Sequence, residues 1–154
     1  MNQKEVRNNS ILEKLESIDS EKVDNQFLSL HNEVFTQIDC LDCANCCKNY
    51  SPIIIQEDIP NILSALKISS MELFTDFIEM DEDGDFVFKS KPCPMLDLNT
   101  NKCSIYEHRP MACREYPHTN MKNILDYSDI LIKNALICPA VDKILEKIEL
   151  SFAE

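Results

Sequence analysis

The sequence predicts a mainly α-helical fold with one small β-hairpin, arranged compactly around a loop-rich, cysteine-bearing centre. The chain of 154 residues contains a single glycine and no tryptophan. Because β-sandwiches and barrels use glycine in their many tight turns, this composition favours helices. Apolar residues make up 44% of the chain, which is typical of a globular protein. We therefore expect one domain that spans residues 1–154.

Residues 1–37 have the apolar spacing of two consecutive helices and are predicted to form a helical N-terminal extension. The first stripe consists of Ile11, Leu12, Leu15 and Ile18, and the second of Phe27, Leu28, His31, Val34, Phe35 and Ile38. Between the stripes, Asp19 and Ser20 can end one helix and cap the next. Because His31 lies on an apolar face, we expect it in the core or at its boundary rather than at a metal.

Short elements are predicted for the middle of the chain. Pro52 precedes three isoleucines at 53–55, which indicates a short buried strand. Residues 56–66 should form a short helix with Pro60 in or near its first turn, where proline is tolerated.

The run Ser69-Ser70-Met71-Glu72 matches a capping box and should start a helix that carries Met71, Phe74, Phe77 and Ile78. The acidic run at 81–85 contains the Asp83-Gly84 pair between two apolar runs, which predicts a hairpin turn. These acids are also similar to a calcium loop, but Ser90 stands where that loop requires glutamate, so we interpret the run as a turn.

The last part of the chain alternates loops with helices. Residues 93–106 are loop-rich, with a turn at 99–101. A short helix is expected at 107–115 with Pro110 in its first turn, and a weakly helical stretch at 120–137. The final amphipathic helix, 140–151, has an apolar stripe of Val141, Ile144, Leu145 and Ile148.

Four thiols lie within eight residues in the run Cys40-Leu41-Asp42-Cys43-Ala44-Asn45-Cys46-Cys47. A hydrophobic core does not require such a cluster, whereas thiolates are soft ligands for zinc, Cu(I) and iron–sulfur clusters. Two thiols separated by two residues can turn onto one metal, so C-x2-C recurs in such sites. All eight cysteines are therefore candidate metal ligands: Cys40, Cys43, Cys46, Cys47, Cys93, Cys103, Cys113 and Cys138.

Charge and apolar content exclude several classes of partner. The net charge is −12 and lysines and arginines are not clustered, so we expect neither nucleic acid nor an anionic membrane as a partner. Residues 1–10 lack the apolar run of a signal peptide, and no stretch approaches the ~18 apolar residues of a membrane span. The expected location is the cytoplasm. Thiols there stay reduced, which favours metal over a disulfide framework or redox pair.

The spaced cysteine motifs together resemble the YkgJ-type CxxCxxCC cysteine-cluster family, described as zinc- or iron-chelating. The matching residues are Cys40-x-x-Cys43-x-x-Cys46-Cys47, Cys93-Pro94-Met95-Leu96, Cys103-Ser104-Ile105-Tyr106, the run from Arg109 to Pro117 around Cys113, and Cys138-Pro139. The resemblance covers about residues 40–139, the expected cysteine-cluster core, and implies metal chelation by cysteine. A similar domain occurs within flagellin lysine methylases, although this chain has no glycine-rich cofactor loop.

Eight cysteines can form two sites of four, because tetrahedral zinc and cubane clusters each take four thiolates. Cys46 and Cys47 point in different directions, so Cys47 belongs to a second site or is a free thiol; one site with four unused cysteines is the simpler alternative. Two C-x2-C steps followed by Cys-Pro units favour an iron–sulfur cluster slightly over zinc.

Several side chains near the cysteines have more than one reading. Lys48, Lys102, Arg109 and Arg114 can offset thiolate charge, or the two arginines can pair with Glu107 and Glu115. We expect His108 and His118 to be exposed rather than ligands, and Tyr106 and Tyr116 to pack over the site.

The predicted function is a cysteine-ligated metal-binding protein with a redox, sensing or accessory role. A structural-zinc interaction module is a second hypothesis, with the terminal helices docking on a protein partner. A metal-dependent enzyme related to protein methylation is the third.

Overall fold

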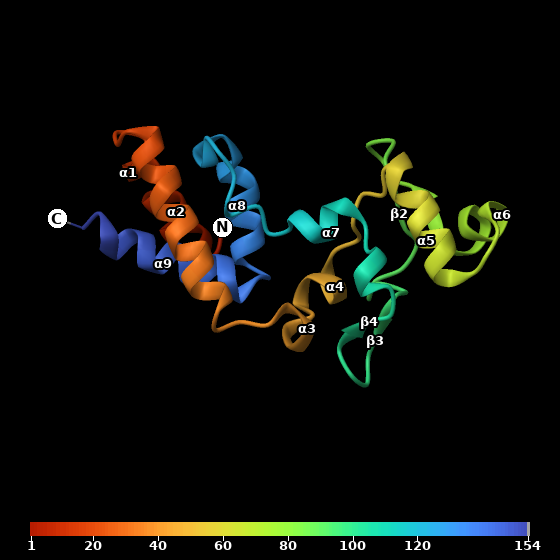
Figure 1. Cartoon of the computed structure of the whole chain (residues 1–154). Helices are drawn as coiled ribbons and strands as arrows, with labels where there is room; N and C mark the ends of the chain where they lie inside the picture. Colours follow the sequence, from red (N-terminus) through yellow and green to blue (C-terminus); the bar gives the residue numbers. More distant parts are fainter. Residues whose placement is uncertain (154) are drawn as a thin grey trace. The chain divides into compact units, whose positions relative to one another are not determined.

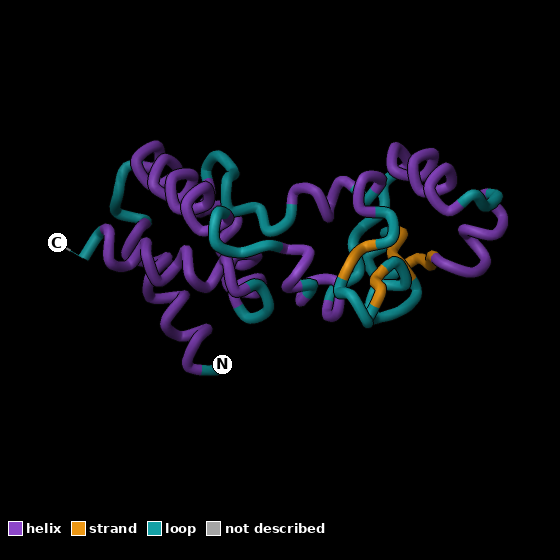
Figure 2. The backbone as a smooth tube through the Cα atoms, turned by 60° about the horizontal axis from the view of Figure 1, so that its bottom comes forward, coloured by secondary structure: helices purple, strands orange, loops and turns teal. Residues whose placement is uncertain are grey.

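A computed structural model of the chain describes residues 1–153, and these form two compact units. Unit 1 joins Met1–Asp39 to the segment that begins at Pro117, and unit 2 comprises Cys40–Tyr116. Helices dominate the chain, and the few strands belong to unit 2 (Figures 1 and 2). The predicted class, mainly α with minor β, is confirmed.

Unit 1 is a set of packed helices. These are α1 (Gln3–Leu15), α2 (Ser20–Phe35), α8 (Ser128–Ala135) and α9 (Pro139–Ser151), with a 3-10 turn η4 (Ile124–Tyr127) before α8. Helix α9 packs against α2 and α8, and α1 packs against α8 and α9. The buried core consists of Ile11, Leu12, Leu15, Val23, Phe27, Leu30, Val34, Ile124, Leu131, Ala135, Ala140, Val141, Ile144, Leu145 and Ile148.

The apolar stripes predicted for the terminal helices are largely confirmed. All four predicted positions of α9 are buried, so this stripe is used inside unit 1 and is not a free docking face. In α2, however, Leu30 is buried while Leu28, which the sequence placed in the stripe, is exposed. The predicted break is also confirmed, since the Asp19 carboxylate accepts the backbone N–H of Lys22 and caps α2.

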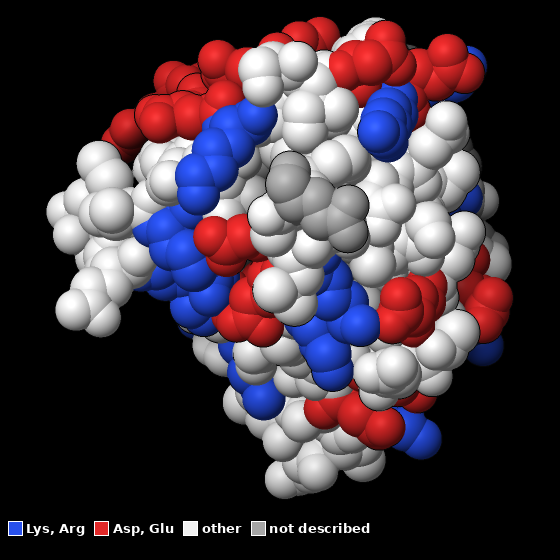
Figure 3. Space-filling view, turned by 90° about the vertical axis from the view of Figure 1, so that its left-hand side faces the viewer, with Lys and Arg blue, Asp and Glu red and all other residues white. Residues whose placement is uncertain are grey.

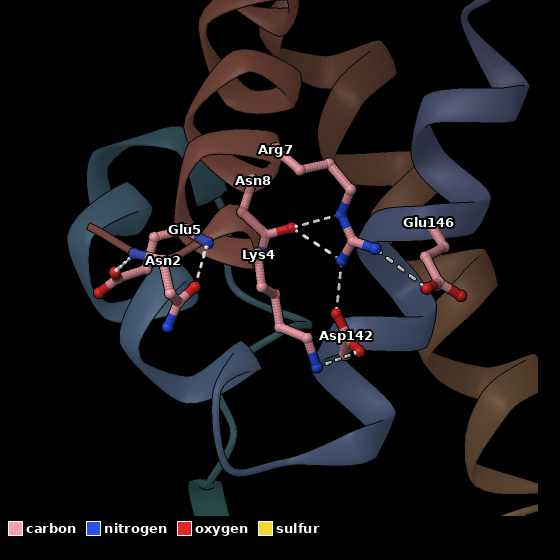
Figure 4. Close-up of polar contacts among 7 residues, drawn as sticks. All are labelled: Asn2, Lys4, Glu5, Arg7, Asn8, Asp142 and Glu146. Carbon is pink, nitrogen blue, oxygen red and sulfur yellow. Dashed lines mark hydrogen bonds and ion pairs between the residues drawn. The ribbon is translucent and has the colours of Figure 1, made fainter.

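Ion pairs link the exposed side of α1 to α9 (Figure 4). The Lys4 Nζ atom lies 2.7 Å from Asp142 Oδ2, and Arg7 bonds both Asp142 and Glu146. Beside them, buried Asn8 accepts two hydrogen bonds from the Arg7 guanidinium. The network fixes the register of two helices that are far apart in sequence.

Unit 2 is assembled from short elements. In chain order they are α3 (Cys40–Cys43), α4 (Asn45–Asn49), η1 (Gln56–Asp58), α5 (Ile59–Leu66), α6 (Ser70–Glu72), the π-type turn η2 (Leu73–Phe77), β1 (Ile78–Met80), β2 (Phe86–Phe88), β3 (Leu96–Asp97), β4 (Lys102–Cys103), η3 (Tyr106–His108) and α7 (Met111–Glu115). Its separate core contains Ile54, Ile62, Leu73, Ile78, Phe88, Met95 and Ile105.

The hairpin predicted around Gly84 is present. Strands β1 and β2 are antiparallel, and Gly84 has a φ of 85°, a left-handed conformation that suits glycine. The predicted strand at 53–55 is wrong, because this segment makes a single bridge between Ile53 and Val87. A second ladder, not expected from the sequence, pairs Leu96 with Cys103.

Two helices predicted for unit 2 differ in extent from the expectation. The capping box at Ser69 and Glu72 is formed, but the helix passes into η2 after one turn, and Ile78 belongs to a strand. The helix expected at 107–115 divides at Pro110, which caps α7. Proline has no N–H to continue the preceding turn, which explains the division.

None of the helices in residues 1–153 is both long and apolar enough to cross a membrane.

Candidate metal centre

The CxxCxxCC run forms two short helices separated by a sharp reversal. Cys40 and Cys43 begin and end α3, and Cys46 and Cys47 lie in α4. Between the helices, Ala44 is buried and has a φ of 51°, a left-handed conformation uncommon for a residue with a Cβ. Because of this reversal, α3 and α4 follow each other directly, and each carries two of the four thiols of the run.

Backbone contacts bring the distant cysteines of unit 2 to this run. The Cys93 N–H donates to the Cys47 carbonyl oxygen at 2.7 Å, which fixes the start of the β3–β4 segment beside α4. Cys103 lies on β4, which contacts α3. The side chains of Cys93 and Cys103 also pack against the unit 2 core.

Cys47 interacts electrostatically with three thiols that are distant from it in the sequence. A hydrogen bond with the Cys46 thiol lowers the pKa of Cys47 to about 7, and the same bond, with burial, raises the pKa of Cys46. Burial raises the pKa of Cys93 to about 11 and that of Cys113 to about 12, and it also raises the pKa of Cys103. The Cys47 thiolate adds to each of these three shifts, so four thiols from α4, β4, α7 and the loop at Cys93 share one neighbourhood.

Arg109 supplies positive charge to this neighbourhood. Its guanidinium lies 3.9 Å from the centre of the Tyr106 ring and donates to the Tyr106 carbonyl oxygen at 2.8 Å. From there its charge acts to lower the pKa of Cys103 and of Cys113, against the effect of burial. Of the readings left open by the sequence, this contact supports charge compensation by Arg109.

Arg114 has a different role, because it points to a carboxylate that the sequence did not single out. Its Nη2 lies 3.9 Å from Oδ1 of Asp58, which is almost completely buried. The Asp58 side chain also accepts the backbone N–H groups of Met111 at 2.9 Å and of Ile55 at 3.1 Å. Asp58 thereby joins η1 to the first turn of α7, the helix that carries Cys113. An acid inside the short helix predicted at residues 56–66 gave no sign of this long-range contact.

The eight predicted ligands are divided between the two units. Seven lie in unit 2, whereas Cys138 lies in unit 1 and packs against the core of that unit. Cys40 is exposed and the other cysteines are partly buried; all eight are free of disulfides. Within residues 1–153, no three His, Cys, Asp or Glu side chains converge at the spacing of one metal ion. Among the described residues, the thiols of unit 2 thus lie near one another without forming a coordination shell.

The aromatic and histidine side chains have supporting positions. The Tyr50 and Tyr116 rings of unit 2 lie 6.2 Å apart at a tilted angle. In unit 1, His31 Nδ1 is 2.7 Å from Thr119 Oγ1 and its ring packs on Phe35, which matches the expected boundary position. His108 is exposed, as expected, but His118 is partly buried.

Comparison with known proteins identifies the class of this chain. Residues 39–139 match the CxxCxxCC family, whose description reads "Putative zinc- or iron-chelating domain". Because this match covers about two-thirds of the chain, the protein belongs to that family, and cysteine-based chelation of zinc or iron is the property that defines it.

A similar protein adds no functional description to this family assignment. An uncharacterized protein of Methanocaldococcus jannaschii, MJ0661, is 30% identical over 82 residues. The match covers 52% of this chain and 44% of the relative, so the chain spans less than half the length of that protein. No solved structure matches the chain.

Proposed function

We propose that unit 2 binds one metal centre through Cys47, Cys93, Cys103 and Cys113, and that this centre is an iron–sulfur cluster. The observation that carries the proposal is that Cys93, Cys103 and Cys113, which are distant in sequence, lie close enough to Cys47 for its charge to raise their pKa values. Four cysteine thiolates are the ligand set of such clusters. When bound, a cluster supplies one-electron redox chemistry, which suits a role in electron transfer or sensing.

The four cysteine thiols fit this centre, and we expect metal binding to bring their sulfur atoms into one coordination shell. Thiols bind metals as thiolates, so protons leave as the ligands coordinate. Cys47, with its pKa of about 7, is the thiol most readily available as a first ligand at neutral pH. Arg109 then offsets part of the negative charge that four thiolates bring together. The remaining cysteines of the run, Cys40, Cys43 and Cys46, lie outside this proposed set of four ligands.

Structural zinc is the second candidate for the same ligands. The thiols of Cys93, in the loop before β3, and of Cys103, on β4, are both partly buried, and four such cysteines suit a tetrahedral zinc site. Such a centre would stabilise unit 2 without redox chemistry. The protein would then be an interaction module rather than an electron carrier.

The two candidates are separated by analysis of protein purified without oxygen. An iron–sulfur cluster gives visible charge-transfer absorption with matching iron and acid-labile sulfide. Colourless protein with stoichiometric zinc would replace the iron–sulfur proposal by the zinc candidate. Protein that contains neither metal after growth with both would overturn the proposed chelation.

Serine variants test which cysteines hold the metal. Cys47→Ser, Cys93→Ser and Cys113→Ser should each lose most of the bound metal, whereas Cys40→Ser, at the exposed position, should keep it. Equal losses in Cys40→Ser and Cys47→Ser would contradict the proposed ligand set. Circular dichroism of each variant checks that the helices persist.

A further inference from the structure

The hairpin end of unit 2 has exposed apolar side chains on neighbouring short elements. Met71 of α6 is 80% exposed, Met80 of β1 is 61% exposed and Phe74 of η2 is 40% exposed. The Phe74 ring meets the Phe86 ring edge to face, with centroids 5.3 Å apart. Met80 and Phe86 are directly paired across the hairpin and so share one face of it. We call Met71, Phe74, Met80 and Phe86 the hairpin patch.

This composition is characteristic of binding surfaces. Methionine and aromatic side chains are enriched in the buried centres of protein interfaces, and flexible methionines adapt to varied partners. Ile78 and Phe88, the next pair on the same face of the hairpin, are buried in the core of unit 2, and Phe86 packs against that core, so the strands themselves are anchored. The patch is therefore a fixed apolar surface rather than a loose loop.

The segment that carries the patch is acidic. Residues 68–88 contain seven acids and neither lysine nor arginine. The ammonium group of Lys89, the next cation along the chain, donates a hydrogen bond to the Thr75 carbonyl oxygen. On the face shown in Figure 3, by contrast, lysine and arginine atoms lie beside aspartate and glutamate atoms. The hairpin segment lacks such compensation within its own sequence.

We propose that the hairpin patch docks a positively charged segment of another protein, in which lysine or arginine side chains alternate with apolar ones. Apolar anchors would cover Met71, Phe74 and Met80 while the cations meet the surrounding carboxylates. A second copy is disfavoured, because a two-fold interface would bring the acidic segment against itself. The inference goes beyond the proposed metal site, and its test does not depend on metal content.

The test measures binding of a fluorescent amphipathic peptide of lysine and leucine to the full-length, metal-loaded protein. The peptide should bind, and its counterpart with glutamate in place of lysine should not. The double variant Met71→Gln/Met80→Gln should weaken binding at least about tenfold at unchanged charge. The control Leu98→Gln/Leu150→Gln removes two other exposed apolar side chains and should bind like the wild type.

A charge pair tests the electrostatic part. Asp76→Asn, on the same element as Phe74, should weaken binding more than Glu16→Gln, which removes the same charge from an exposed position of unit 1. Equal effects of the two charge variants, or no effect of the methionine variant, would mean that the peptide follows net charge only and would overturn the proposal. Self-association of the wild type that Met71→Gln/Met80→Gln abolishes would also overturn it, because the occupant would be a second copy.

Discussion

Outside the cysteines, the buried carboxylate of Asp58 has the most direct link to the proposed site, because it anchors the helix that carries Cys113. It accepts N–H groups of two segments and lies beside Arg114, so one side chain holds the start of α7 in place. A carboxylate in this position acts on Cys113 through the backbone, without contact with the metal.

Asp58→Ala should destabilise the protein by about 1–3 kcal/mol, because two backbone donors lose a charged acceptor. It should also lower metal content, since the helix that carries Cys113 loses its anchor. Chemical denaturation and metal analysis measure the two effects. Asp24→Ala is the matched control, because Asp24 also accepts two backbone N–H groups but lies in unit 1, away from the proposed ligands. If both variants retain full metal content, Asp58 does not position Cys113.

The stability of unit 1 should depend on pH through the protonation of His31. Burial lowers its pKa below the usual 6.5, so a proton binds more readily to the unfolded chain. The stability that neutral His31 contributes is complete above about pH 6.5 and is lost as the pH falls toward its folded pKa. Between about pH 7 and pH 5 the melting temperature of His31→Gln should therefore fall less than that of the wild type. Exposed His108→Gln should follow the wild type, and parallel curves for all three proteins would contradict this role.

At the scale of single elements, the β3–β4 hairpin, which carries the proposed ligand Cys103, makes few packing contacts. Its interior contacts are those of Met95 and Ile105, together with Cys93 and Cys103, which pack on the unit 2 core. The turn between the strands, residues 98–101, is almost entirely exposed. Metal ligation is therefore expected to hold this segment.

Removal of the metal with a chelator should open the turn at residues 98–101 to proteases. Structural metal binding is worth on the order of 10 kcal/mol, comparable to the whole stability of a domain of about 5–15 kcal/mol. Cys103→Ser should reproduce the new cleavage without chelator, because serine matches cysteine in shape but does not ligate. The β1–β2 hairpin offers a comparison, since its turn at Gly84 should be cleaved at the same rate with and without metal. Unchanged cleavage near residue 100 would mean that Cys103 is not a ligand.

At the scale of the whole molecule, the separate cores predict a separate response to metal. The core of unit 1 is built from residues of unit 1, and that of unit 2 from residues of unit 2. Hydrogen exchange measured with and without chelator should therefore change in unit 2, above all in α4, α7 and β4. Amides of α2 and α9 should keep their protection. Equal loosening of both units would contradict this independence.

The local sequence determined much of the helical part of the fold. Apolar spacing placed α1, α2 and α9, the acid at Asp19 placed the break between the first two, and Gly84 placed the hairpin turn. These features depend on a few neighbouring residues, so spacing and capping rules capture them. The same holds for the identity of the site, because eight cysteines in family spacing need no fold to indicate chelation.

Only the tertiary structure decided which residues meet. Ile53–Ile55 has the composition of a strand, yet its only ladder contact among the described residues is a single bridge from Ile53 to Val87. The sequence could not reveal that Asp58 anchors α7, that Arg109 faces Cys103 and Cys113, or that Cys47 lies beside three distant thiols. Such contacts join segments tens of residues apart, and their partners are selected by packing and burial rather than by local spacing.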